Sequence, residues 1–70
     1  MKDSELYARF KRAIDHEANG WRGCDRLTEL EKREKAQNMI YGIVTAALFV
    51  LPENYYHDLV TYIHEQGFNH

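Results

Sequence analysis

The spacing of apolar residues predicts a first helix over residues 4–18. Its stripe has the i, i+4, i+7 and i+8 spacing of one helix face and consists of Leu6, Phe10, Ala13 and Ile14. Asp3 or Ser4 is expected to cap its start, because a side-chain oxygen there accepts hydrogen bonds from free backbone N–H groups. The pair Asn19–Gly20 predicts its end, since glycine adopts the left-handed conformation at little cost. Residues 19–27 then form a connector.

A second helix is predicted over residues 29–51. Thr28 and Glu31 have the spacing of a capping box, in which each side chain accepts a hydrogen bond from the other residue's backbone N–H. The first two turns of this helix are charged, whereas its second half is apolar. Leu51 predicts its end, because the following Pro52 pushes that residue out of helical geometry.

The second half of that helix, Met39–Leu51, carries no charge, although a surface helix of a small monomer normally has a polar face. At about 100° per residue, one broad side is predicted to meet the core. This side holds Ile40, Ile43, Val44, Ala47, Val50 and Leu51. The large side chains of this block that point away from the core side are Tyr41, Leu48 and Phe49. Gly42 and Ala46 form a small notch, and the charged first turns are expected to project into solvent or lie along a partner.

A third helix is predicted over residues 53–66. Its apolar stripe consists of Tyr56, Leu59, Val60 and Ile63. Gly67 followed by Phe68 is typical of a Schellman ending, in which the apolar residue contacts the last turn. Because the connection at Pro52 is so short, the second and third helices must lie at an angle or antiparallel.

These elements predict an all-α fold: a single three-helix domain over residues 1–70 with helices at about 4–18, 29–51 and 53–66. Residues 40–51 also suit a strand, because Ile, Val, Tyr and Phe favour strands. The helix is preferred because the chain offers no second strand to pair with, and an isolated strand is not stable.

The size of the chain favours self-association. A domain of 70 residues leaves only about 3–5 kcal/mol of folding free energy from a single core. The one cysteine excludes an internal disulfide, and no CxxC pair is present for a structural zinc site. We therefore expect a helical homodimer. A single cysteine also agrees with a reducing cytoplasm.

Neither a signal peptide nor a transmembrane segment is predicted. The N-terminal residues are charged and lack an apolar stretch of the kind that signal peptides contain. The uncharged block of 13 residues is shorter than the roughly 20 apolar residues that span a bilayer. We interpret the chain as a soluble cytoplasmic protein, and association of Met39–Leu51 with a membrane surface is kept as an alternative.

The charges are distributed unevenly along the chain. All nine lysines and arginines lie within residues 2–35, and residues 36–70 carry only three acidic side chains. The C-terminal half is therefore a poor surface for phosphates. The alternative function is nucleic-acid binding by the N-terminal half, with Trp21 as a stacking group. The basic residues for that role are Arg9, Arg12, Arg22, Arg26 and Lys32.

The sequence predicts no enzyme, no metal site and no cofactor. His57 and His64 share a helix face with Glu53, but a metal centre needs three or four ligands held together. A pH-dependent role of these histidines is left open, because histidine titrates near pH 6. Cys24 lies between two arginines that favour a thiolate, but no base is specified beside it, so a structural cysteine is preferred.

Binding to another protein is the predicted function, as a regulator or inhibitor whose helical interface is dimeric. Surplus apolar surface in so small a chain is the physical reason. Trp21 is either an interface residue or a cover for the core, because tryptophan serves both roles. The predicted interface residues are Trp21, Arg22, Arg26, Tyr41, Gly42, Ala46, Phe49, Tyr55 and Tyr62.

Overall fold

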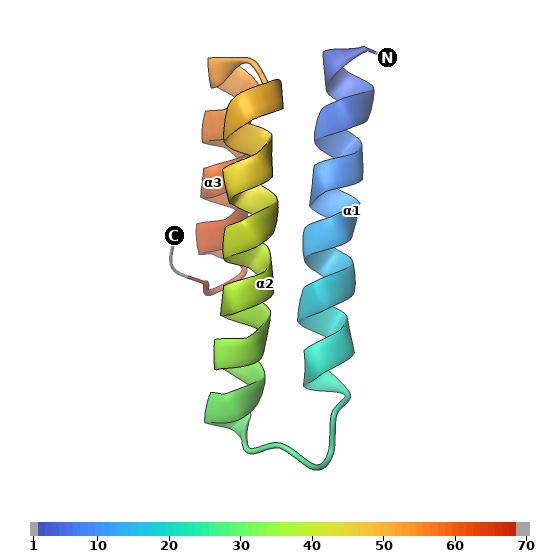
Figure 1. Ribbon diagram of the computed structural model, residues 1–70, viewed down its shortest axis with the longest axis vertical. Helices are drawn as coiled ribbons and strands as arrows, with labels where there is room; N and C mark the ends of the chain where they lie inside the picture. Colours follow the sequence, from blue (N-terminus) through green and yellow to red (C-terminus); the bar gives the residue numbers. More distant parts are fainter. Residues whose placement is uncertain (1, 69–70) are drawn as a thin grey trace.

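A computed structural model describes residues 2–68 and shows three helices that run up, down and up again along one long axis (Figure 1). They are α1 (Asp3–Arg22), α2 (Glu29–Val50) and α3 (Glu53–Glu65). These described residues contain no strand, which confirms the all-α, three-helix prediction. The short connection at Pro52 turns the chain back on itself, so α2 and α3 lie antiparallel.

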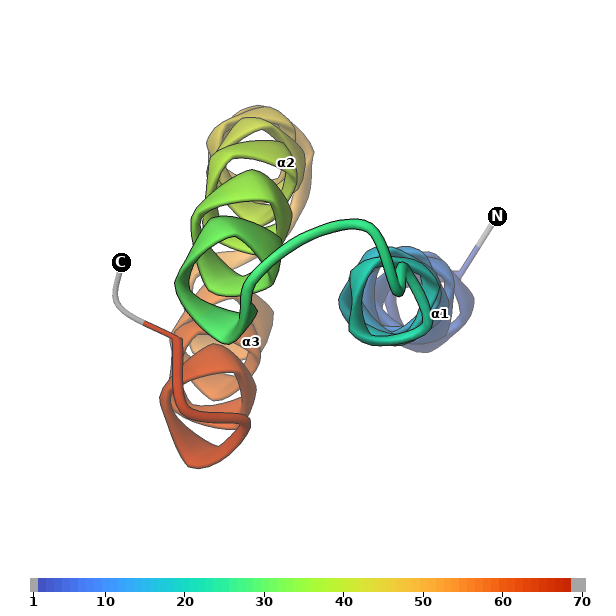
Figure 2. The same cartoon turned by 90° about the horizontal axis from the view of Figure 1, so that it is seen from below.

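The core lies where the three helices meet. Seen along the long axis, α1 lies beside the pair formed by α2 and α3, and it packs most extensively against α2 (Figure 2). The molecule measures 39 × 19 × 18 Å. Its buried apolar residues are Ile14, Ala18, Ala36, Ile40, Val44, Ala47, Leu51, Leu59, Ile63 and Phe68.

Helix α1 is longer than predicted. The predicted stop at Asn19–Gly20 is wrong, because the helix continues to Arg22 and ends at Gly23. The extra turn lets Trp21 extend the stripe of α1 against the core, one turn beyond Ala18. This packing outweighs the roughly 1 kcal/mol by which glycine disfavours a helix. The predicted cap is also wrong, because Lys2 occupies the N-cap position without a side-chain hydrogen bond.

The capping box at the start of α2 is confirmed. The Glu31 backbone N–H donates to Thr28 Oγ1 at 3.2 Å, and the Thr28 backbone N–H donates to Glu31 Oε1 at 3.1 Å. The hydrogen bond from the Thr28 backbone holds the pKa of the Glu31 carboxyl below its usual value. Because this pKa is lowered in the folded state, the box stabilises the fold at neutral pH, and its contribution is lost as the pH falls through that pKa.

Thr28→Ala is expected to lower the free energy of unfolding by about 0.5–2 kcal/mol, because the Glu31 N–H loses its acceptor. Urea unfolding followed by circular dichroism measures this change. Thr61→Ala is the matched control, since Thr61 is exposed in the interior of α3. An equal loss in both variants would contradict the role assigned to the cap.

Both predicted helix endings around α3 are confirmed. Leu51, before Pro52, has the extended conformation φ −93°, ψ 142° and stops α2. At the other end, Gly67 has a left-handed φ of 87°. The Phe68 N–H donates to the Ile63 carbonyl at 3.2 Å, which is the long hydrogen bond of a Schellman motif. This turn places the Phe68 side chain in the core.

Candidate functional site

The inner side of α2 is largely as predicted. Ile40, Val44 and Ala47 are buried and Ile43 is partly buried. The assignment of Val50 to the core side is wrong, because its side chain is 54% exposed. α1 and α3 cover only one sector of α2, and Val50 lies at the margin of that sector in the last turn.

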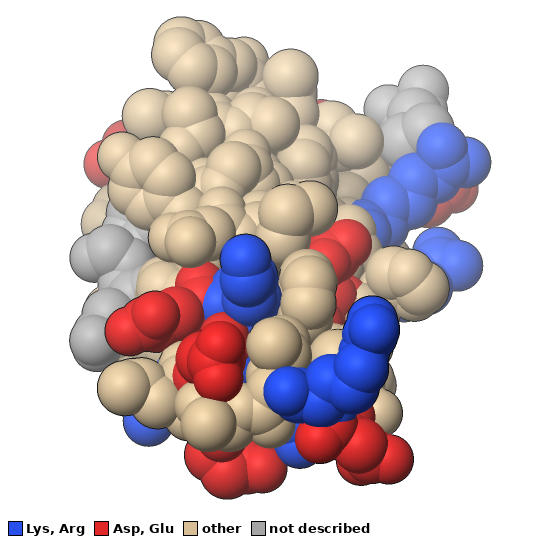
Figure 3. Space-filling model, turned by 60° about the horizontal axis from the view of Figure 1, so that its bottom comes forward, with Lys and Arg blue, Asp and Glu red and all other residues tan. Residues whose placement is uncertain are grey.

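The outer side of α2 is a continuous uncharged surface. Its large apolar side chains are between 48% and 80% exposed, with Phe49 the most exposed of them. Figure 3 shows a broad area without charged side chains, with charged side chains at the lower end and along the right edge of the view. We call the outer side of α2 the uncharged α2 face, and it comprises Met39, Tyr41, Gly42, Thr45, Ala46, Leu48, Phe49 and Val50.

Gly42 and Thr45 bear on the shape and the polarity of this face. A methyl group added at Gly42 would meet no other group within 4 Å, so the packing of the chain itself does not require a glycine there. A glycine inside a helix costs about 1 kcal/mol relative to alanine. The Thr45 hydroxyl donates a hydrogen bond to the Tyr41 carbonyl at 2.8 Å, so this donor is satisfied within the helix. Gly42 and Ala46 are both exposed and lie one turn apart.

The charged first turns of α2 contact the chain's own helices. Lys32 Nζ lies 3.3 Å from the Arg22 carbonyl oxygen at the end of α1 and 3.1 Å from Glu29 Oε1. Arg33 donates a hydrogen bond to the Gly67 carbonyl. The expectation that these turns lie in solvent or along a partner is therefore wrong for Lys32, whose side chain is only 13% exposed, whereas Arg33 remains exposed. A cation at a helix C-terminus is favourable, because the last carbonyls of the helix carry partial negative charge.

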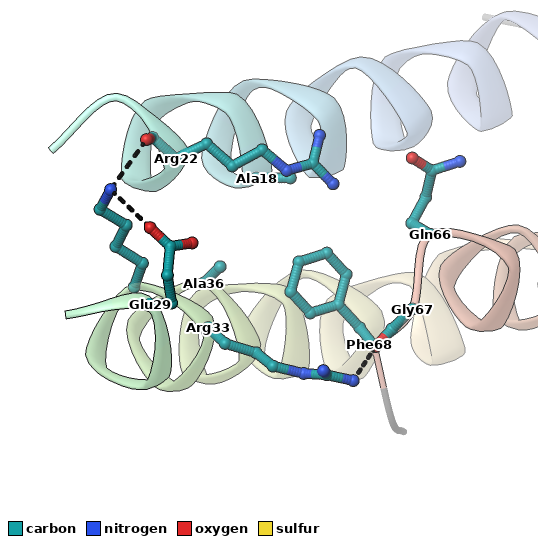
Figure 4. A pocket seen from close by; sticks show the side chains of 9 residues that line it. Ala18, Arg22, Glu29, Arg33, Ala36, Gln66, Gly67 and Phe68 are labelled. Atoms are coloured by element: carbon teal, nitrogen blue, oxygen red, sulfur yellow. Dashed lines mark hydrogen bonds and ion pairs between the residues drawn. The ribbon is translucent and has the colours of Figure 1, made fainter.

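These contacts surround a pocket of about 270 Å³ between the ends of the three helices (Figure 4). Ala18, Ala36 and the ring of Phe68 form its apolar part. Its polar lining consists of Arg22, Glu29, Lys32, Arg33 and Gln66. Three cations against one carboxylate give this pocket a positively charged lining. We call these three cations at the pocket, Arg22, Lys32 and Arg33, the basic end.

The structure does not gather the residues of the nucleic-acid alternative into one surface. Lys32 is only 13% exposed and is paired with Glu29. Arg12 and Arg22 are ten residues apart on α1, which is about 15 Å along the helix axis. Arg9 is exposed near Arg12 on α1, and Arg26 is exposed in the connector that precedes α2.

Trp21 lies in α1 and not in a loop, which corrects the predicted connector. Its side chain packs against the core and is partly buried. Tyr55 and Tyr62 are also partly buried against the chain's own core. Tyr55 lies with its ring centroid 5.4 Å from that of Tyr7. An interface role for Trp21, Tyr55 and Tyr62 stays a prediction, whereas Tyr41 and Phe49 are well exposed.

Tyr62 links α3 to α1. Its hydroxyl donates a hydrogen bond to Asp15 Oδ1, and Lys11 Nζ lies 4.5 Å from the centroid of its ring. The hydrogen bond to Asp15, followed by burial, raises the pKa of Tyr62 to about 12. Since this pKa exceeds the value of 10.0 for an unperturbed tyrosine, the contact stabilises the fold below pH 10 and is lost as the pH rises toward 12.

Tyr62→Phe is therefore expected to reduce the loss of stability that the protein shows between pH 10 and pH 12. Urea unfolding at several pH values across this window measures the effect. Tyr55→Phe serves as the control, because Tyr55 is also partly buried on α3 but lies beside Tyr7 and not beside Asp15. If Tyr62→Phe loses as much stability with pH as the unchanged chain, the link between Tyr62 and Asp15 is not responsible.

The remaining histidine, cysteine and carboxylate side chains of the described residues do not gather into a metal site. Among residues 2–68, no three His, Cys, Asp or Glu side chains are placed to hold a metal ion together. His57 Nε2 lies 3.6 Å from Glu53 Oε1, one turn earlier on α3. Cys24 is a half-buried free thiol in the connector. None of the described helices is long and apolar enough to cross a membrane.

Comparison with protein families, with curated proteins and with solved structures finds no match to this chain. Its function is therefore inferred from its own surface. The uncharged α2 face and the basic end are its two surface features of contrasting charge. The first belongs to the second half of α2, and the second joins the first turns of α2 to the end of α1.

Proposed function

We propose that this protein is a small protein-binding module, a regulator or inhibitor, that forms a homodimer through the uncharged α2 face. The observation that carries the proposal is the exposure of several large apolar side chains within one uncharged surface. Contiguous apolar patches on small monomers commonly mark sites of association. We prefer a second copy of the chain as the partner at this face. Two uncharged faces can pack together without placing like charges opposite each other.

Burial of this face in a dimer supplies free energy that the chain does not obtain from its own core. Moving a large apolar side chain such as Phe49 out of water is favourable by about 1.5–3 kcal/mol. Phe49 is 80% exposed in the single chain, so most of this gain is still available. For a 70-residue domain with about 3–5 kcal/mol of its own stability, such gains matter.

The basic end is the proposed contact for a target protein. Its residues belong to the end of α1 and the first turns of α2, whereas the uncharged α2 face belongs to the second half of α2. Arg22 and Arg33 are exposed at this pocket, whereas Lys32 is paired there with the single carboxylate of the lining, Glu29. Charge complementarity then favours an acidic surface on the target.

Light scattering coupled to size-exclusion chromatography tests the proposal. The expected mass at micromolar concentration is about twice the 8.3 kDa of the chain. Dilution should shift the population toward single chains, and thermal unfolding should move to lower temperature at the same time. A mass of one chain at all micromolar concentrations would overturn the proposal.

A further inference from the structure

We infer that the two copies of the proposed dimer join by antiparallel packing of their α2 helices, with Phe49 of each copy seated over the Gly42–Ala46 notch of the other. The inference rests on the proposed function, and it adds the orientation and register of the interface. It is carried by the shape of the uncharged α2 face, by the position of the charges on α2 and by the unexplained glycine.

The uncharged α2 face has a projection and a gap on one line. Gly42 and Phe49 are seven residues apart, so they point to nearly the same side of the helix, about 10 Å apart along its axis. Phe49 projects into solvent, and Gly42 with Ala46 leaves a gap one turn long. Small residues of this kind let another helix approach closely.

An antiparallel pair with a two-fold axis brings these features together twice. The midpoint between Gly42 and Phe49 lies between Thr45 and Ala46. A two-fold axis at that point places Gly42 of each copy opposite Phe49 of the other, so both rings are seated at once. Such a self-complementary contact is closed, as expected for a two-fold homodimer.

The charges on α2 favour this orientation over a parallel one. A parallel pair places each residue beside its own copy, so Glu31 meets Glu31 and Lys35 meets Lys35. The antiparallel pair instead lays the uncharged block Met39–Leu51 on itself, because the two-fold axis lies near the centre of this block. The charged first turns then extend past the end of the contact. Like charges are kept apart.

The glycine supports the same arrangement. Gly42 lies in the interior of α2, and the surrounding chain leaves open space where a side chain would be. Its backbone is helical with a negative φ, so no turn requires a glycine there. Close approach of a ring from a second copy gives a physical reason for the missing side chain.

Gly42→Leu distinguishes a seated ring from a merely apolar contact. If Phe49 occupies the notch, leucine fills it, and the dimer is expected to dissociate at about tenfold higher concentration. If the two faces associate only through nonspecific apolar contact, the apolar surface added by leucine makes the dimer tighter. That result would overturn the inference. Gly20→Leu is the matched control, because Gly20 is also helical with open space beside it but lies on α1, and it should leave the dimer unchanged.

Disulfide trapping tests the orientation in a Cys24→Ser background. Ala46→Cys lies beside the two-fold axis and is expected to form a disulfide between copies under mild oxidation. Asn38→Cys is exposed on the same side of α2, but the two copies of residue 38 lie about 22 Å apart in the antiparallel pair. This is far beyond the roughly 7 Å that a disulfide can bridge.

The outcomes separate the two proposals. Trapping through residue 46 without trapping through residue 38 supports the antiparallel register. Trapping at both positions indicates a parallel pair. Trapping at neither position, in a protein with the mass of a dimer, places the interface elsewhere. Either result overturns the antiparallel register but not the dimer. If both the Cys24→Ser protein and the protein without substitutions have the mass of one chain in light scattering, the proposed function itself is overturned.

Discussion

Phe49→Asp is expected to convert the proposed dimer into single chains that remain folded. The Phe49 side chain is 80% exposed and belongs to no part of the core, so its loss leaves the packing of the three helices intact. In the dimer the same position is covered, and a carboxylate there is buried without a partner. Breaking a contact in this way costs several kcal/mol, about 3–5 where the charge is fully desolvated. The mass measured by light scattering should halve, while the helical circular dichroism signal is retained.

Leu30→Asp is the matched control for that change. Leu30 is also a large exposed apolar residue of α2, with 67% of its surface accessible, but it lies in the charged first turns. An aspartate in the first turn of a helix is favourable, so no loss of stability is expected. The dimer should persist in this variant. Equal masses for the Phe49 and Leu30 variants would place the interface outside the uncharged α2 face.

Leu59→Ala is expected to remove most of the stability of the protein. Leu59 of α3 is fully buried in the core formed with α1 and α2. Removing a buried leucine side chain costs about 2–5 kcal/mol, because apolar burial is lost and a cavity remains. A single core of this size supplies only about 3–5 kcal/mol in total. The loss therefore removes most of the available stability, and urea unfolding followed by circular dichroism reports it directly.

The comparison for this variant is Leu30→Ala, which makes the same chemical change at an exposed position. Its effect on the free energy of unfolding should stay within about 0.5 kcal/mol, as for most surface substitutions. A cooperative, nearly unchanged unfolding transition in Leu59→Ala would show that α3 does not contribute to the core as described.

The features that the sequence predicted well are those set by local chemistry. The capping box of Thr28 and Glu31 needs only two side chains three residues apart. Pro52 stops α2 by steric exclusion, and Gly67 ends α3 with its left-handed conformation. The exposure of Phe49 also followed from its angle on the helix, since it lies opposite the buried Ile40 and Val44.

The features that it missed are those decided by contacts between helices. A glycine at position 20 is a local stop signal, and only the packing of Trp21 against the core shows why α1 continues past it. The stripe from Ile14 through Ala18 to Trp21 already contained this signal. The contact of Arg33 with Gly67 joins positions far apart in the chain, and no spacing rule reveals it.

The separation of charge along α2 has a consequence for how tightly a target is held. In the proposed antiparallel dimer, the two basic ends point in opposite directions, so one assembly offers two identical attachment points. A target that carries two matching acidic sites, or that is itself a dimer, then engages both. The second attachment is intramolecular, and the resulting avidity exceeds the affinity of a single end by about 10²–10⁴ where the geometry allows both to form.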